Sequence, residues 1–150
     1  MESSPPARVL VVAHRTAATP ALLDAVSDRA KSGPVQFTLL VPRSPHGLHR
    51  LVDPEDQGQS EAEETLDLAL PLLEKAAGQP VEGRVGDHNP YDAICDAVNI
   101  DGYDEIIIST LPVRVSRWLR ADLPSKLRAL GLPITTIIAP SSRQKAEAAG

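Results

Sequence analysis

The sequence predicts an α/β domain, with a five-stranded parallel sheet sandwiched between two layers of helices. Three observations lead to this prediction. Short runs of Val, Ile and Leu alternate with longer amphipathic stretches along the 150 residues. The first of these runs, Val9–Ala13, is continuously apolar, which is typical of a strand covered on both faces. One helix-length stretch separates each pair of runs, as a parallel crossover requires. The order β-α-β-α-β-α-β-α-β therefore follows, with helices on both faces of the sheet.

The first strand and helix have clear boundaries in the sequence. The apolar run Arg8–Ala13 predicts the first strand. Thr19 has the place of an N-cap, and Pro20 then opens the first helix. Gly33 marks the end of that helix, and the run Val35–Val41 predicts the second strand.

The segment Pro42–Gln59 has no periodicity and is rich in Pro, His, Asp and Gly. An irregular stretch of this length in a compact domain is usually a lid, a binding loop or a disordered segment. Ser60 and Glu63 have the spacing of a capping box, which predicts that the second helix starts there. Pro71 removes a backbone donor inside this helix and predicts a kink.

The second half of the chain repeats the alternation. Residues Val81–Val85 predict a short third strand. Asn89 followed by Pro90 predicts the capped start of a third helix, which we expect to end near residue 100. The apolar run Glu105–Thr110 predicts the fourth strand, and Asp122 is expected to cap the last helix.

Composition limits the function. We expect one domain at residues 8–140, with flexible tails at 1–7 and 141–150. The net charge of -5 argues against nucleic-acid binding, and no apolar run approaches a membrane span. The first residues lack the features of a signal peptide, so a cytoplasmic location is expected. The single cysteine, Cys95, excludes an internal disulfide framework and is expected to be a buried, inert thiol.

Four segments share their order and spacing with a known family. They are Val85–Ile94, Tyr103–Thr110, Ser116–Leu119 and Leu132–Ile138. Together they resemble the universal stress protein family, and the resemblance extends from about residue 8 to residue 139. It implies the strand order 3-2-1-4-5, a cleft between the loops after strands 1 and 4, and often a homodimer formed through strand 5.

ATP-binding members of that family carry a glycine motif after strand 4, whose backbone amides approach the phosphates. On this chain the glycines fall on Ser109, Pro112 and Ala121, and the hydroxyl residue falls on Asp122. Pro112 has no N–H, Ala121 adds a methyl group, and Asp122 adds a negative charge. The chain therefore resembles a divergent member, and we expect neither ATP bound in the family manner nor another cofactor.

Basic residues gather in the loops expected at the carboxyl ends of the strands, where such sheets bind ligands. Guanidinium groups match phosphate and carboxylate groups in bidentate fashion. One hypothesis is therefore a small anionic or nucleotide ligand, and the other is a solvated loop face whose arginines pair with nearby acids. The residues expected to contact a ligand are Arg15, Thr110, Arg114, Ser116, Arg117 and Arg120.

Three functions are compatible with these residues. The first is a regulatory or binding module of the universal stress protein type. The second is a ligand-free homodimer that contacts a protein partner. The third, an adenine-nucleotide hydrolase, is disfavoured because the chain has no nucleophile elbow, and we expect no catalytic residues and no metal site. Residues 134–138 predict the fifth strand, an uncharged edge that a second copy would cover through Ile134, Thr136 and Ile138.

Overall fold

A computed structural model describes residues 5–14, 16–43, 54–111, 117–120 and 122–139. The expected carboxyl-terminal tail, residues 141–150, lies outside these ranges. The first strand begins at Ala7, one residue earlier than expected. Within the described ranges, none of the helices is long and apolar enough to cross a membrane.

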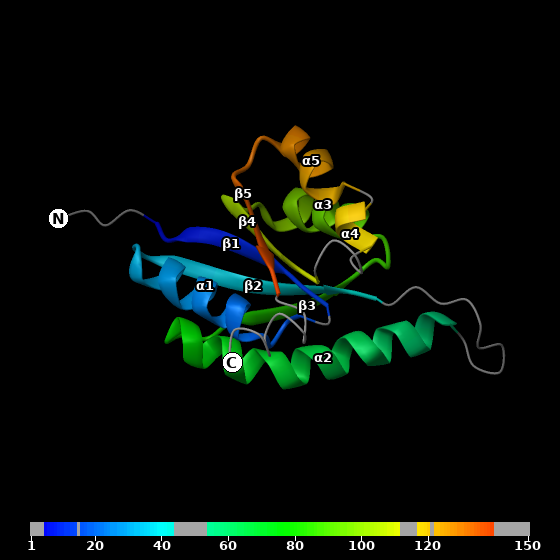
Figure 1. Cartoon of the computed structure of the whole chain (residues 1–150), viewed down its shortest axis with the longest axis horizontal. Helices are drawn as coiled ribbons and strands as arrows, with labels where there is room; N and C mark the ends of the chain where they lie inside the picture. Colours follow the sequence, from blue (N-terminus) through cyan, green and yellow to red (C-terminus); the bar gives the residue numbers. More distant parts are fainter. Residues whose placement is uncertain (1–4, 15, 44–53, 112–116, 121, 140–150) are drawn as a thin grey trace, which may run out of the picture.

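The sheet has the predicted strands and the predicted order. All four strand pairings are parallel, and the order is β3-β2-β1-β4-β5 (Figure 1). The strands are β1 (Ala7–Val12), β2 (Val35–Pro42), β3 (Glu82–Gly86), β4 (Glu105–Thr110) and β5 (Ile134–Ile138). The fourth and fifth strands have the bounds that their apolar runs predict.

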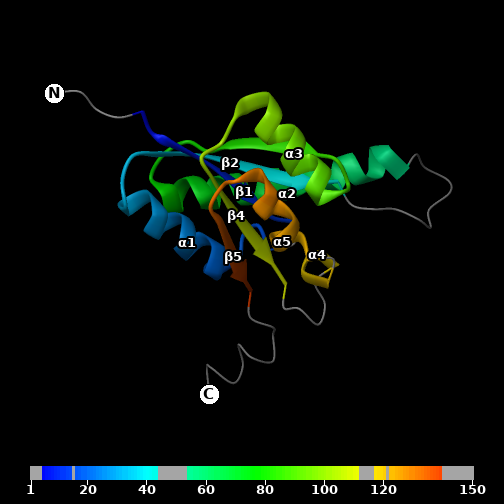
Figure 2. The same ribbon diagram turned by 90° about the horizontal axis from the view of Figure 1, so that it is seen from above.

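Helices cover both faces of the sheet, as predicted. The helices are α1 (Pro20–Lys31), α2 (Pro54–Ala77), α3 (Pro90–Asp101), α4 (Arg117–Arg120), α5 (Leu123–Leu127) and the 3-10 turn η1 (Arg128–Leu130). Figures 1 and 2 show α1 and α2 on one face of the sheet, with α3 and α5 on the other. The molecule is therefore a three-layer α/β sandwich.

The central strand β1 contributes to both apolar layers. Val9 and Val11 are buried in the layer formed with α1 and α2. Leu10 and Val12 are buried in the layer formed with α3 and α5. Because successive strand residues point to opposite faces, a continuous apolar run fills both layers at once. Full burial of each such side chain contributes roughly 1.5–3 kcal/mol.

The start of α2 differs from the prediction. The helix begins at Pro54, so residues 54–59 are helical rather than irregular, and Ser60 and Glu63 lie inside the helix. Pro54 occupies the first helical position, which suits proline because its backbone lacks an N–H and its φ is already helical. This earlier start makes the capping-box prediction wrong. The helix continues through Pro71, and the kink there stays a prediction.

The three predicted caps have different outcomes. Asn89 caps α3, and its side-chain oxygen accepts hydrogen bonds from the backbone nitrogens of Tyr91 (3.0 Å) and Asp92 (3.2 Å). Thr19 precedes α1, but its hydroxyl donates to the carbonyl oxygen of Thr16 at 2.9 Å instead. Asp122 precedes α5 with a left-handed backbone (φ 57°, ψ 42°) and makes no side-chain cap. An acceptor cap needs an extended backbone, so this conformation explains the failure.

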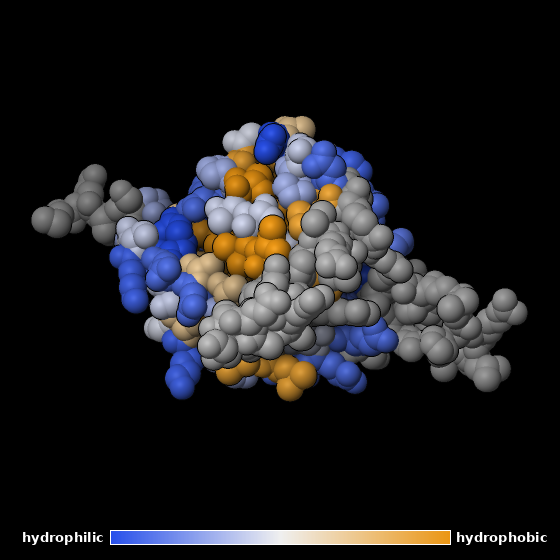
Figure 3. All heavy atoms as spheres, viewed as in Figure 1, coloured by the Kyte–Doolittle hydropathy of each residue, from blue (hydrophilic) through white to orange (hydrophobic). Residues whose placement is uncertain are grey.

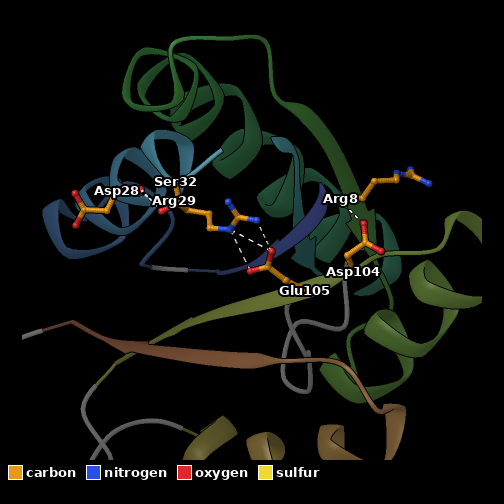
Figure 4. A network of polar contacts seen from close by, with 6 residues as sticks. All are labelled: Arg8, Asp28, Arg29, Ser32, Asp104 and Glu105. Carbon is orange, nitrogen blue, oxygen red and sulfur yellow. Dashed lines mark hydrogen bonds and ion pairs between the residues drawn. The ribbon is translucent and has the colours of Figure 1, made fainter. Parts of the chain in front are cut away.

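A polar network joins the amino-terminal end of β4 to α1 and β1 (Figure 4). The guanidinium of Arg29 donates to both carboxylate oxygens of Glu105, at 2.5–3.1 Å. This hydrogen bonding to Glu105 is the main cause that raises the pKa of Arg29. The backbone nitrogen of Arg8 donates to Asp104 Oδ2 at 2.9 Å, and its guanidinium lies 5.1 Å from the ring centre of Tyr103. The network lies at the amino-terminal ends of the strands, opposite the carboxyl ends at which a ligand is expected.

Two glycines of β3 differ in how much a methyl group would disturb the core. A Cβ on Gly86 would lie 2.7 Å from Ala93 Cβ and 2.9 Å from Leu40 Cδ1. A Cβ on Gly83 would lie 2.8 Å from the far end of the Leu70 side chain, which can rotate away.

We predict that Gly86→Ala lowers the free energy of unfolding by about 1–3 kcal/mol, because Ala93 is held on a helix and cannot yield. The matched variant Gly83→Ala should lower the free energy of unfolding by a clearly smaller amount. Urea denaturation of both variants measures the difference. Equal losses would contradict the close approach of α3 to β3.

Candidate functional site

The order of the sheet fixes where its connections change direction. Strand β1 lies between β2 and β4, and Val12 of β1 is aligned with Leu40 and Ile108. After β1 the chain adds β2 and β3 on one side of β1, and it then crosses to add β4 and β5 on the other side. Such a switch point, at the carboxyl ends of the strands, is where open α/β sheets bind ligands.

Two buried hydroxyl groups connect the chain across this switch point. Thr16, in the segment after β1, and Ser109, near the end of β4, are each at most 2% exposed. Their side-chain oxygens lie 2.6 Å apart in a hydrogen bond. The segment after β1 is thereby held against the end of β4.

A third buried hydroxyl, that of Thr110, differs from this pair. Thr110 is 3% exposed, and its Oγ1 has no hydrogen-bond partner within the described part of the chain. Its side chain leaves the opposite face of β4 from that of Ser109 because strand residues alternate. The backbone oxygen of Thr110 accepts a hydrogen bond from Ala139 N at 2.8 Å, so the end of β5 fixes this position.

Ser109 is the residue that the resemblance noted in the sequence would align with the first glycine of the ATP-binding motif. Its buried hydroxyl and Cβ lie where a glycine would leave the backbone bare. The hydroxyl is engaged with Thr16 in a hydrogen bond that is buried from solvent. Sequence reasoning missed Thr16, and the only local signal was a hydroxyl residue just after an apolar strand.

Most of the predicted ligand contacts lie outside the described residues. Thr110 is described and buried at the expected end of β4. Arg117 and Arg120 begin and end the single turn α4, but their side chains are outside the described part. The remaining predicted positions outside the described ranges are Arg15, Pro112, Arg114, Ser116 and Ala121. Convergence of the arginines therefore stays a prediction.

Trp118 has a structural role in the described part of the loop. It is partly buried and packs against the layer formed by α3, α5 and the sheet. This position favours a core contact over a stacking surface for a base.

A hollow of about 370 Å³ lies away from the switch point, beside β3 and α3. Arg43 on its rim lies 3.7 Å from Asp87, and Arg84 pairs with Asp101. Both guanidinium groups are thus neutralised by neighbouring carboxylates. The sequence did not predict this hollow, and the carboxylates paired with its two arginines disfavour binding of an anion there.

The single cysteine is partly buried on α3, rather than fully buried as expected. Its hydrogen bond with the Tyr91 hydroxyl, one turn earlier, is the main cause that raises the pKa of Tyr91. Among the described residues, no three His, Cys, Asp or Glu side chains come together in a way that could hold a metal ion.

This architecture defines a doubly wound α/β domain with its switch point between β1 and β4. Its fold is that of universal stress proteins. A family member from Arabidopsis thaliana with AMP bound has a TM-score of 0.62 and 15% identity, over 92% of this chain and 95% of that one. The protein from Archaeoglobus fulgidus in complex with dAMP has a TM-score of 0.61 and 21% identity, over 89% and 98%.

A third universal stress protein, in complex with cAMP, has a TM-score of 0.57 and 16% identity, over 93% of this chain and 100% of that one. No protein-family model matches the sequence, and no curated protein is significantly similar to it. The likeness is therefore one of fold, which by itself does not define a ligand.

We predict that Thr16→Val lowers the free energy of unfolding by about 1–3 kcal/mol, because it leaves the Ser109 hydroxyl buried without a partner. Ser109→Ala should have a similar effect. The double variant should lose less free energy of unfolding than the two single variants lose together, since neither hydroxyl is then left buried without its partner. Chemical denaturation of the four proteins gives the coupling, and strictly additive losses would contradict the hydrogen bond.

Proposed function

We propose that this chain is a divergent binding module of the universal stress protein type. It holds a small anionic ligand, of the size of a nucleoside monophosphate, at the loops after β1 and β4. The observation that carries this proposal is the buried hydroxyl of Thr110, which has no partner among the described residues. An unsatisfied buried hydroxyl costs about 1–3 kcal/mol, which a ligand oxygen accepting its hydrogen bond would offset.

Two further observations support a monophosphate rather than a triphosphate. The three similar structures hold AMP, dAMP and cAMP. In this chain, two residues at the motif positions differ from a phosphate cradle: Ser109 fills the first with a buried side chain, and Asp122 brings a carboxylate. Repulsion between Asp122 and a polyphosphate would be stronger than with a single phosphate, because it grows with charge.

The arginines after β1 and β4 supply the positive charge in this proposal. They are Arg15, Arg114, Arg117 and Arg120. A charge-assisted hydrogen bond from one guanidinium contributes roughly 1.5–3 kcal/mol, so two or three suffice for a small anion. No catalytic step is part of the proposal, and release of phosphate from ATP by the purified protein would contradict that part of it.

We predict that AMP or cAMP raises the melting temperature of the protein, whereas ATP has a smaller effect. Thr110→Val should weaken binding about tenfold, because the loss of one hydrogen bond of about 1.4 kcal/mol has that effect. Thr38→Val is the matched control, since Thr38 is also buried, in the middle of β2. Arg117→Ala should weaken binding about tenfold or more.

Calorimetric titration of the four proteins with AMP, cAMP, ATP and inorganic phosphate measures these differences. Two results would overturn the proposal. One is the absence of binding by all four compounds at millimolar concentration. The other is equal affinity of wild type and Thr110→Val for the ligand that binds.

A second proposal concerns the outer edge of the sheet. Among the described strands, β5 is at the edge of the sheet and pairs only with β4, and Ile138 at its end is 51% exposed. Figure 3 shows apolar surface gathered over β5. An uncharged edge strand with free backbone groups is a template for pairing. We propose that a second copy covers it, in a homodimer formed through Ile134, Thr136 and Ile138.

We predict that Ile138→Lys converts this dimer to a monomer, because it places a charge in the paired edge. Ile100→Lys is the matched control, since Ile100 is 71% exposed on α3. Light scattering at micromolar concentration measures the mass of each protein. A monomeric wild type would refute the dimer.

A further inference from the structure

Helix α2 has a second apolar face that the described structure does not cover. Its inner face packs on the sheet through Ala62, Leu66, Ala69 and Leu73, which are at most 8% exposed. On the outer side, Leu68 is 75% exposed and Leu72 is 43% exposed. These leucines are four residues apart and therefore lie next to each other on the helix surface.

The two leucines form a patch rather than isolated exposed residues. Pro71, also exposed, lies beside them and extends the apolar area. Figure 3 shows an apolar patch at the lower surface of the molecule, over α2 as labelled in Figure 1. The other exposed large apolar residues in the described ranges, Ile100 and Ile138, lie on different elements. Single exposed apolar side chains are ordinary, whereas a contiguous patch on one helix points to a contact. We define Leu68, Pro71 and Leu72 as the outer patch.

Charged residues flank the outer patch with opposite signs at its two ends. Glu61 and Glu64 lie on the amino-terminal side, and Lys75 lies on the carboxyl-terminal side. Helical spacing places all three within about 40° of the direction of Leu68, at 100° per residue. All three are exposed. From the amino-terminal to the carboxyl-terminal end of α2, its outer face is thus acidic, then apolar, then basic.

We propose that the outer patch binds a second copy of this chain, with the two α2 helices antiparallel about a two-fold axis level with residue 70. Leu68 and Leu72 lie two residues before and after that level, so Leu68 meets the partner's Leu72 and the reverse. Glu64 lies six residues before the axis and Lys75 five after it. In the antiparallel pair, Glu64 and the partner's Lys75 are therefore offset by one residue, or about 1.5 Å along the helix, well within the reach of a lysine.

The charges favour a second copy in this orientation. An antiparallel pair places acidic ends against basic ends, which makes the surface complementary to itself, as a two-fold contact requires. A parallel pair would place Glu64 against the partner's Glu64 and Lys75 against the partner's Lys75, and like charges repel. The apolar centre is small, so the contact belongs to the weak and transient class.

Sedimentation equilibrium between about 10 and 500 µM tests the contact in an Ile138→Lys background, which removes pairing through β5. We expect concentration-dependent dimers in this background. Leu68→Ser should weaken association at least about tenfold, because each dimer loses two buried leucine contacts. Ile100→Ser is the matched control and should leave association unchanged. Circular dichroism establishes that both variants fold, which is expected since both sites are exposed.

A charge exchange tests the orientation of the helices. Lys75→Glu should weaken association about threefold or more, because it places like charges together twice in each dimer. Adding Glu64→Lys to Lys75→Glu should restore it. A background protein that stays monomeric at all concentrations, no effect of Leu68→Ser, or a double variant as weak as Lys75→Glu would each overturn the proposal. Nucleotide binding does not enter this experiment, so its outcome is independent of the proposed function.

Discussion

The burial of β1 on both faces is the constraint on which the rest of the structure depends. Its residues alternate between the layer under α1 and α2 and the layer under α3 and α5. A shift of one residue would exchange the two sets of side chains, so the register is strongly fixed. That register aligns Val12 with Leu40 and Ile108. The carboxyl ends of three strands therefore lie level, and the Thr16–Ser109 hydrogen bond forms there as a consequence of core packing.

The strands could be predicted well from the sequence because their signals are local and redundant. The run Glu105–Thr110 contains three successive isoleucines, is rich in β-branched residues and is preceded by a turn, and these signals agree on a strand there. Asn89 with Pro90 is similarly unambiguous. The start of α2 was mistaken because Ser60 and Glu63 fit a capping box equally well inside a helix that Pro54 has already begun. Asp122 was mistaken because its side chain gives no sign of a left-handed backbone.

The candidate site could be predicted only in part. Thr110 was placed at the end of β4 because the bounds of that strand were predicted correctly. The hydrogen bond between Thr16 and Ser109 could not be predicted from the sequence. It joins residues 93 positions apart and depends on both strand register and side-chain direction. The arginines present the converse case. Their number and spacing are plain in the sequence, but their convergence depends on a loop conformation that no local pattern determines.

The two proposed self-contacts lie on different elements, and this has consequences for assembly. Each is a two-fold contact, so either alone gives a closed dimer. Together they give a closed tetramer if the two axes intersect at right angles, and an open chain of dimers if the axes do not intersect. The β5 contact extends a sheet through backbone hydrogen bonds, whereas the outer patch of α2 offers only two leucines and a proline between charges. In this proposal the stronger β5 contact forms the dimer, and association of dimers through the outer patch depends on protein concentration.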